Sequence, residues 1–208
     1  PVMRDVSDGL TSGLLWLYQT SGAVGTGILG LFYAPLVITG LHQSFPAIET
    51  QLIANVKQTG GSFIFPIASV SNIAQGASAL AVLFLTKDKK QRGLASSASM
   101  SALLGITEPA MFGINLKLKF PFVASMIGSG VASVYLGLTH VLAVSLGSNS
   151  VLGFISIATT AIPSFLISCV ISFCVSFSVT YLYGRRQEVT EMLQTDGDEK
   201  PNEAMAAN

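Results

Sequence analysis

The sequence predicts an all-α integral membrane protein with about four transmembrane helices and two re-entrant hairpins. Half of the 208 residues are hydrophobic and only 11% are charged, whereas ordinary soluble domains carry about 25% charged residues. The charged residues are also clustered, and long uncharged stretches separate the clusters. These stretches mark the places where the chain crosses a membrane.

Four stretches are long and apolar enough to cross the hydrocarbon layer as helices, which takes about 20 residues. The first two are residues 13–40 and 62–86. The other two lie within the 65 uncharged residues 120–184. The sequence SLGSNSVLG, residues 145–153, separates them, because glycine, serine and asparagine favour turns.

The segment 93–116 has the length of a crossing but the composition of a break. Its apolar residues favour insertion, while the carboxylate of Glu108 opposes it by about 2.5–3.5 kcal/mol, so the two contributions nearly cancel. Pro109 also removes a backbone donor. The basic sequences KDKKQR and KLK flank the segment. Because positively charged loops stay in the cytoplasm, both ends lie on one side, and we predict a re-entrant hairpin with Glu108 at its tip.

A second irregular region lies at about residues 42–61. An apolar helix ends near Gly40 and runs into His42 and Gln43, and a short amphipathic piece then ends at the glycines GG. We predict a second re-entrant hairpin here. Paired interrupted segments are typical of the midplane substrate site of a transporter.

The two predicted hairpins supply the candidate site residues. A carboxylate at membrane depth is functional by default, so Glu108 is the strongest candidate, and the alternative is an ion pair that holds the hairpin to a helix. His42 is either a substrate ligand or an ordinary helix-end histidine. Weaker candidates are neighbouring polar side chains: Gln43, Thr107, Asn72 and Gln75. For the last two, hydrogen bonds between helices are the competing interpretation.

Other classes of function find no support in the composition. The net charge of zero leaves no basic surface for nucleic acid. The two cysteines have neither metal-ligand nor redox-motif spacing, so we predict no metal site and no cofactor.

Residues 187–208 carry six acidic residues against one lysine, which predicts a disordered cytoplasmic tail. The chain begins at Pro1, and we expect it to be part of a longer protein.

Three sequences carry a resemblance to a known family: TGLHQSFPAIETQLI, GGSFIFPIASVSNIAQGA and GITEPAMFGINLKLKFPF. They closely resemble the membrane subunit, enzyme IIC, of sugar phosphotransferase systems in the glucose and sucrose superfamily, and are most similar to its sucrose-type members. The resemblance covers residues 10–184. It implies that residues 1–186 are the C-terminal part of an enzyme IIC transport domain.

The resemblance also implies a function. Members of this family are homodimeric multi-pass permeases of the bacterial inner (plasma) membrane that bind an external sugar at a midplane site. A phosphocysteine on an enzyme IIB domain, which works with an enzyme IIA phosphocarrier, then phosphorylates the sugar. By resemblance, His42 of TGLH and Glu108 of GITEP contact the sugar, and Glu108 is a candidate general base.

Sucrose is the sugar that the motifs favour, ahead of trehalose, a β-glucoside or N-acetylmuramic acid. The chain itself shows no phosphocysteine loop, so the phosphotransferase activity would belong to the complete protein. The main alternative is an ion-coupled secondary transporter or channel, in which Glu108 binds a proton or cation. A membrane anchor without transport activity would not need two polar hairpins.

Overall fold

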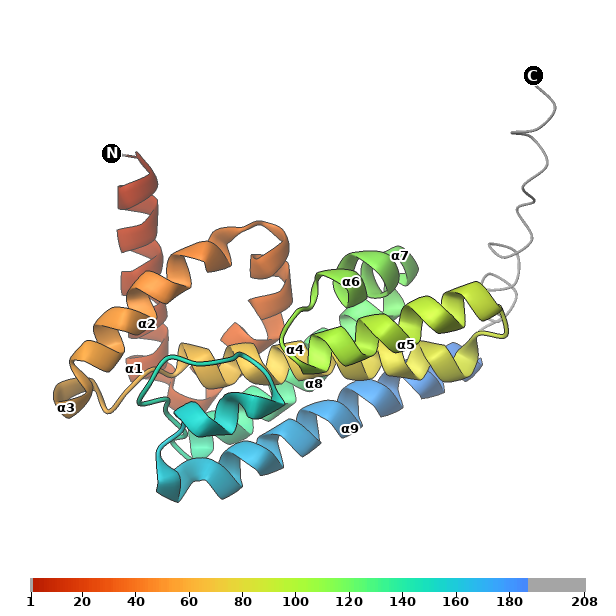
Figure 1. The fold of residues 1–208 in the computed structure, drawn as a ribbon. Coiled ribbons are helices and arrows are strands. Elements are labelled where there is room, and N and C mark those ends of the chain that lie inside the picture. The colour runs from red at the N-terminus through yellow and green to blue at the C-terminus, as the bar shows by residue number, and fades with distance from the viewer. Residues whose placement is uncertain (1, 187–208) are drawn as a thin grey trace.

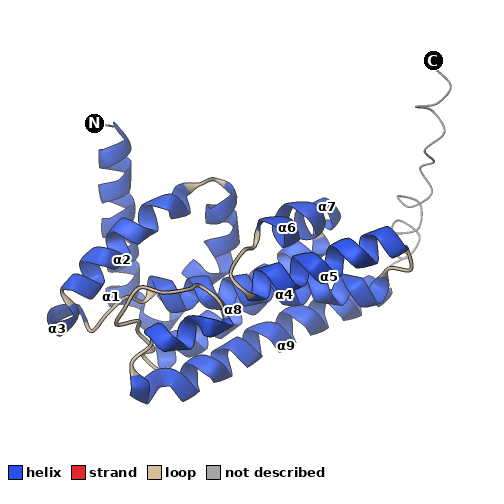
Figure 2. Cartoon of the chain, viewed as in Figure 1, coloured by secondary structure: helices blue, strands red, loops and turns tan. Residues whose placement is uncertain are grey.

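The computed structural model describes residues 2–186, and within this range every regular element is a helix (Figures 1 and 2). Four helices contain stretches long and apolar enough to cross a membrane. They are α1 (Val2–Ile38), α4 (Ile64–Leu85), α8 (Phe120–Leu138) and α9 (Ile162–Arg186). This confirms the all-helical class and the four long apolar helices expected as candidate membrane spans. The predicted tail, residues 187–208, lies outside the described residues.

Helix α4 is the centre of the bundle. It packs against α1, α5, α8 and α9, and most of its residues are buried (Figure 1). Its sequence is rich in alanine and serine, so neighbouring helices can approach closely. Hydroxyl groups add bonds between helices, because Ser172 Oγ of α9 donates to the carbonyl of Val70 at 2.6 Å.

Helices α1 and α8 also pack through small residues. Ser129 Oγ donates to the carbonyl of Gly30 at 2.7 Å, and Thr26 Oγ1 donates to the carbonyl of Ser133 at 2.8 Å. Helix α1 is interrupted at Gly22, which has a positive φ of 49°. The candidate span in this helix, Ser21–Ile38, lies beside the break and within the predicted stretch 13–40.

Residues 93–116 form a helical hairpin and not one continuous helix. Its outgoing arm is α5 (Lys89–Leu103), which begins after Asp88, whose carboxylate accepts from the backbone N–H of Gln91 at 2.8 Å. The return arm folds back along α5. It consists of α6 (Glu108–Ala110), a π-helical stretch (Met111–Asn115) and α7 (Leu116–Leu118). The entry of this hairpin into a membrane stays a prediction.

The second predicted hairpin, residues 42–61, is also helical. Gly40 ends the preceding helix with a φ of 78°, a conformation that glycine adopts without strain. The segment contains a 3₁₀ turn, η1 (Leu41–Ser44), then α2 (Phe45–Ala54) and α3 (Val56–Thr59). Phe45 packs on Tyr33 of α1, with ring centroids 5.7 Å apart. Its place in the membrane likewise stays a prediction.

A long connection joins α8 to α9. It contains two 3₁₀ turns, η3 (Val151–Ser156) and η4 (Thr159–Ala161), and returns to the beginning of α4. The predicted break SLGSNSVLG lies in this connection. The last two candidate spans are therefore separated where the sequence predicted.

Candidate functional site

His42 and Gln43 lie side by side on the 3₁₀ turn that follows α1. The Nε2 atoms of the two side chains are 3.3 Å apart, and His42 Nδ1 is buried without a hydrogen-bond partner. If the Gln43 amide donates to His42 Nε2, the imidazole proton lies on Nδ1. The Nδ1–H group of the ring then has no acceptor, and a ligand oxygen can accept a hydrogen bond from it.

Glu108 lies at the tip of the α5–α7 hairpin. It is exposed, while the preceding Thr107 is buried. Two hydrogen bonds of 2.9 Å hold the turn before it, one from the backbone N–H of Ile106 to the carbonyl of Ser101 and one from Ser101 Oγ to the carbonyl of Ile106. The carboxylate is thus presented at the end of a fixed turn.

Gln75 forms a buried network between helices. Asn115 Nδ2 donates to Gln75 Oε1 at 2.6 Å and to its carbonyl at 3.0 Å, and Gln75 Nε2 donates to Ser125 Oγ at 2.7 Å. These bonds tie the return arm of the hairpin and α8 to α4. They favour a structural role for Gln75 over the ligand role that was its weaker alternative.

The structure brings some predicted residues together and keeps others apart. Asn72 Nδ2 donates to the carbonyl of Asn149 at 2.6 Å, and Asn149 also lies against Gly105 in the turn before Glu108. Asn72 is therefore close to the Glu108 turn. His42 lies on a different element, and no hydrogen bond or ion pair joins it to Glu108 within residues 2–186.

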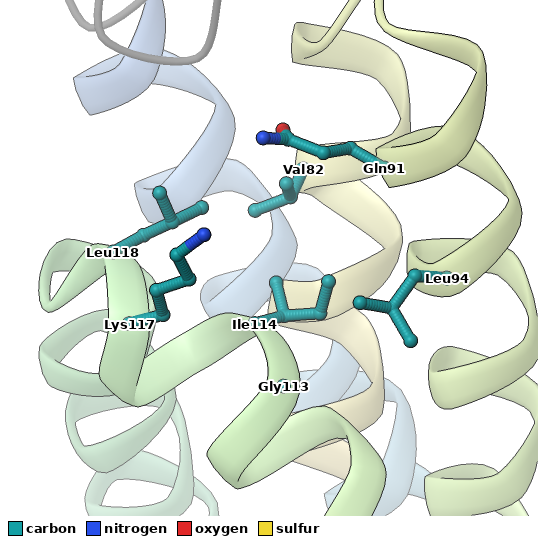
Figure 3. A pocket seen from close by; sticks show the side chains of 7 residues that line it. All are labelled: Val82, Gln91, Leu94, Gly113, Ile114, Lys117 and Leu118. Atoms are coloured by element: carbon teal, nitrogen blue, oxygen red, sulfur yellow. The ribbon is translucent and has the colours of Figure 1, made fainter. Parts of the chain in front are cut away.

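A small pocket opens between α4, α5 and the return arm of the hairpin (Figure 3). Its wall is mainly apolar, and the Lys117 side chain extends along it. The lining residues are Val82, Gln91, Leu94, Gly113, Ile114, Lys117 and Leu118. None of the predicted site residues is among them, so this pocket is separate from the candidate site.

Residues 1–129, more than half of the chain, match the profile of a family described as phosphotransferase system, EIIC. The chain belongs to the EIIC family. This confirms the resemblance that the three sequence motifs carried. Together with the four candidate spans, it places the EIIC chain in the cytoplasmic membrane of a bacterium as a multi-pass protein.

Curated relatives of the EIIC chain are named for disaccharides. A sucrose-specific EIIBCA component of Pediococcus pentosaceus is 63% identical over 186 residues, which is 89% of this chain and 29% of that protein. A sucrose-specific EIIBC component of Staphylococcus xylosus is 58% identical over 159 residues, 76% of this chain and 33% of that protein. A trehalose-specific EIIBC component of Bacillus subtilis is 44% identical over 185 residues, 89% and 39% of the two chains.

The EIIC chain spans less than half the length of these relatives. No solved structure matches it at a significant level. The roles of His42, Gln43, Thr107, Glu108, Asn72 and Gln75 in binding therefore stay predictions.

Sequence reasoning missed a second carboxylate, Glu49 of the EIIC chain. Glu49 is on α2, outside the four candidate spans, and only 5% of its surface is exposed. Its Oε1 has no hydrogen-bond partner, and burial raises its pKa from 4.5 to about 7. The spacing of Phe45, Glu49 and Leu52 was the available signal, because positions i, i+4 and i+7 share one helical face and the first and last are apolar.

Proposed function

We propose that this EIIC chain is the sugar-translocating part of a sucrose permease of the phosphotransferase system. In this proposal sucrose binds at a midplane site between the His42 turn and the hairpin tip that carries Glu108. The observation that carries it is the position of Glu108, an exposed carboxylate at the tip of a broken hairpin in a four-span EIIC chain. The sucrose-specific names of the relatives at 63% and 58% identity support the choice of sugar.

The chemistry of the two side chains suits a sugar. An ionised carboxylate accepts hydrogen bonds only, and each sugar hydroxyl can donate one to it. His42 complements the carboxylate, because its unused Nδ1–H group can donate a hydrogen bond to a hydroxyl oxygen. Glu108 is also proposed as the general base for the hydroxyl that attacks the phosphoryl group.

The proposal includes partners outside this chain. A phosphocysteine of an EIIB domain supplies the phosphoryl group, and an EIIA domain recharges it. The names EIIBC and EIIBCA of the relatives support this arrangement. The resemblance to the family supports a homodimer.

Sucrose uptake into membrane vesicles that contain the full-length protein tests the function. We expect uptake to require phosphoenolpyruvate and the soluble phosphocarrier proteins, and the vesicles to accumulate sucrose phosphate. Vesicles without the full-length protein serve as the control. Accumulation of free sucrose driven by an ion gradient would contradict the proposal and support an ion-coupled transporter.

Cysteine labelling tests the re-entrant position of the α5–α7 hairpin. Lys87→Cys and Lys117→Cys, in a protein whose Cys169 and Cys174 are replaced by serine, should both be protected from an impermeant thiol reagent in intact cells. Both positions carry the positive charge typical of cytoplasmic loops. His140→Cys follows α8 and should be labelled from outside. External labelling of only one of the two lysine positions would show a full crossing.

A further inference from the structure

The connection between α8 and η3 is fixed to the beginning of α4. The backbones of Ser62 and Ala143 exchange two hydrogen bonds of 2.8 Å, and Ala143 also forms a bridge with Ile157. The backbone N–H of Val144 donates to the carbonyl of Ser156 at 2.8 Å. This loop therefore has a defined position next to the bundle and is not a free surface connection.

The tip of this loop, residues 148–150, lies against the hairpin turn that precedes Glu108. A Cβ atom added to Gly105 would lie 3.2 Å from the carbonyl oxygen of Asn149 and 3.4 Å from Ser148 Oγ. Gly105 also has a φ of 102°, which side chains disfavour. The close approach thus places residues 148–150 next to Gly105, which precedes Glu108 by three residues.

The backbone of Asn149 is held by other residues. Its carbonyl accepts from Asn72 Nδ2 at 2.6 Å. Ser148 Oγ and Ser150 Oγ are 2.9 Å apart, and Ser150 Oγ accepts from the backbone N–H of Leu152 at 3.1 Å. The Asn149 side chain takes no part in these bonds, so its amide is free to bind something else.

The side-chain oxygen of Asn149 needs a partner. Asn149 Oδ1 is buried and accepts no hydrogen bond within residues 2–186. Buried amide oxygens are nearly always paired, with protein, water or a ligand, so an unpaired one calls for an explanation. Here the atom belongs to a fixed loop that touches the Glu108 turn and is held by Asn72 of α4.

We propose that Asn149 is a further sugar-binding residue, which contacts a sucrose hydroxyl beside Glu108. This inference rests on the proposed function. Its Oδ1 accepts a hydrogen bond from the hydroxyl and its Nδ2 donates to a hydroxyl oxygen. Glu108 accepts hydrogen bonds only, so the amide supplies a donor that the carboxylate lacks. Asn72 is a positioning residue that fixes the loop through the Asn149 carbonyl.

Equilibrium binding of sucrose to the detergent-purified full-length protein tests this assignment. We expect Asn149→Ala to weaken sucrose binding at least fivefold without a change in thermal unfolding midpoint. Ser148→Ala is the matched control, because it alters the same loop but removes a hydroxyl bonded to Ser150. It should bind sucrose as the wild type does. If Asn149→Ala is not homogeneous in size, Asn149→Ser is measured by the same criteria.

A series of monodeoxy sucroses separates contact from structure. An analogue that lacks a hydroxyl contacted by Asn149 should show a smaller difference in affinity between the wild type and Asn149→Ala than sucrose does. Wild-type affinity for sucrose in Asn149→Ala would overturn the inference, since the buried oxygen would then hold only water. An equal loss for sucrose and every analogue would also overturn it, because this indicates a structural role. Failure of the wild-type protein to bind sucrose would instead contradict the proposed function.

Discussion

Glu108→Gln is expected to fold and to lose at least thirtyfold in sucrose affinity, about 2 kcal/mol. Glutamine keeps the shape and one acceptor oxygen but replaces the other oxygen with a donor. Hydrogen bonds to charged groups contribute about 1.5–3 kcal/mol each, so the loss of the charge and of one acceptor has a large effect. The measurement is equilibrium sucrose binding to size-homogeneous full-length protein.

Two variants make this result interpretable. Glu49→Gln is the matched control, because it makes the same change at the other glutamate among the described residues, and it should bind sucrose normally at pH 6. His42→Ala should weaken binding only about fivefold, since a bond between neutral groups contributes about 1 kcal/mol. The alternative is that Glu108 forms a structural ion pair. Glu108→Gln would then leave the partner charge unpaired and assemble poorly, while the fraction that does fold would bind sucrose normally.

Glu49→Gln is expected to remove a large part of the pH dependence of stability. The pKa of Glu49 is 4.5 in an unfolded chain and about 7 in the fold, so the folded state binds the proton more tightly. Protonation of Glu49 in the fold contributes to the unfolding free energy. This contribution is fully present below pH 4.5 and is lost as the pH rises through about 7. The wild type should therefore lose about 3 kcal/mol of unfolding free energy over this range, at 1.36 kcal/mol per pKa unit.

Thermal unfolding of the two purified proteins in detergent between pH 4.5 and pH 8 measures this effect. The difference between wild type and variant isolates Glu49, because every other titrating group is common to both. We expect the wild-type midpoint to fall with rising pH relative to that of Glu49→Gln. Parallel curves would show that Glu49 is not held protonated by burial.

The sequence predicted the elements that depend on local composition. The uncharged stretches located the four candidate spans. Moving a charged side chain into hydrocarbon is costly, so a long stretch without charge indicates a span. The break near Glu108 followed from Pro109 and the carboxylate itself, and the structure has a turn there with Gly105 at a φ of 102°. The bend of α1 at Gly22 was missed, because glycines are frequent in membrane helices and most of them do not interrupt the helix.

Residues whose importance depends on distant neighbours were not predicted. The spacing of Phe45, Glu49 and Leu52 places Glu49 on an apolar helical face, but only the packing in the structure shows how fully it is buried. Asn149 reads as a turn former, while its link to Asn72 spans 77 positions along the chain. Asn115 was likewise passed over, although it holds the hairpin to α4. No local pattern records such contacts.

The bonds of Gln75 determine which parts of the molecule move together. The return arm of the α5–α7 hairpin cannot slide along α4 without breaking both contacts of Asn115, and α8 is joined to the same side chain. These bonds therefore tie the return arm, α4 and α8 together, and Glu108 lies at the start of that arm. The segment from η1 to α3 takes no part in these bonds, and it is bounded by Gly40 and Gly60, both at positive φ. Displacement of the Glu108 turn relative to α4 therefore requires these buried bonds to break, whereas displacement of the η1–α3 segment does not.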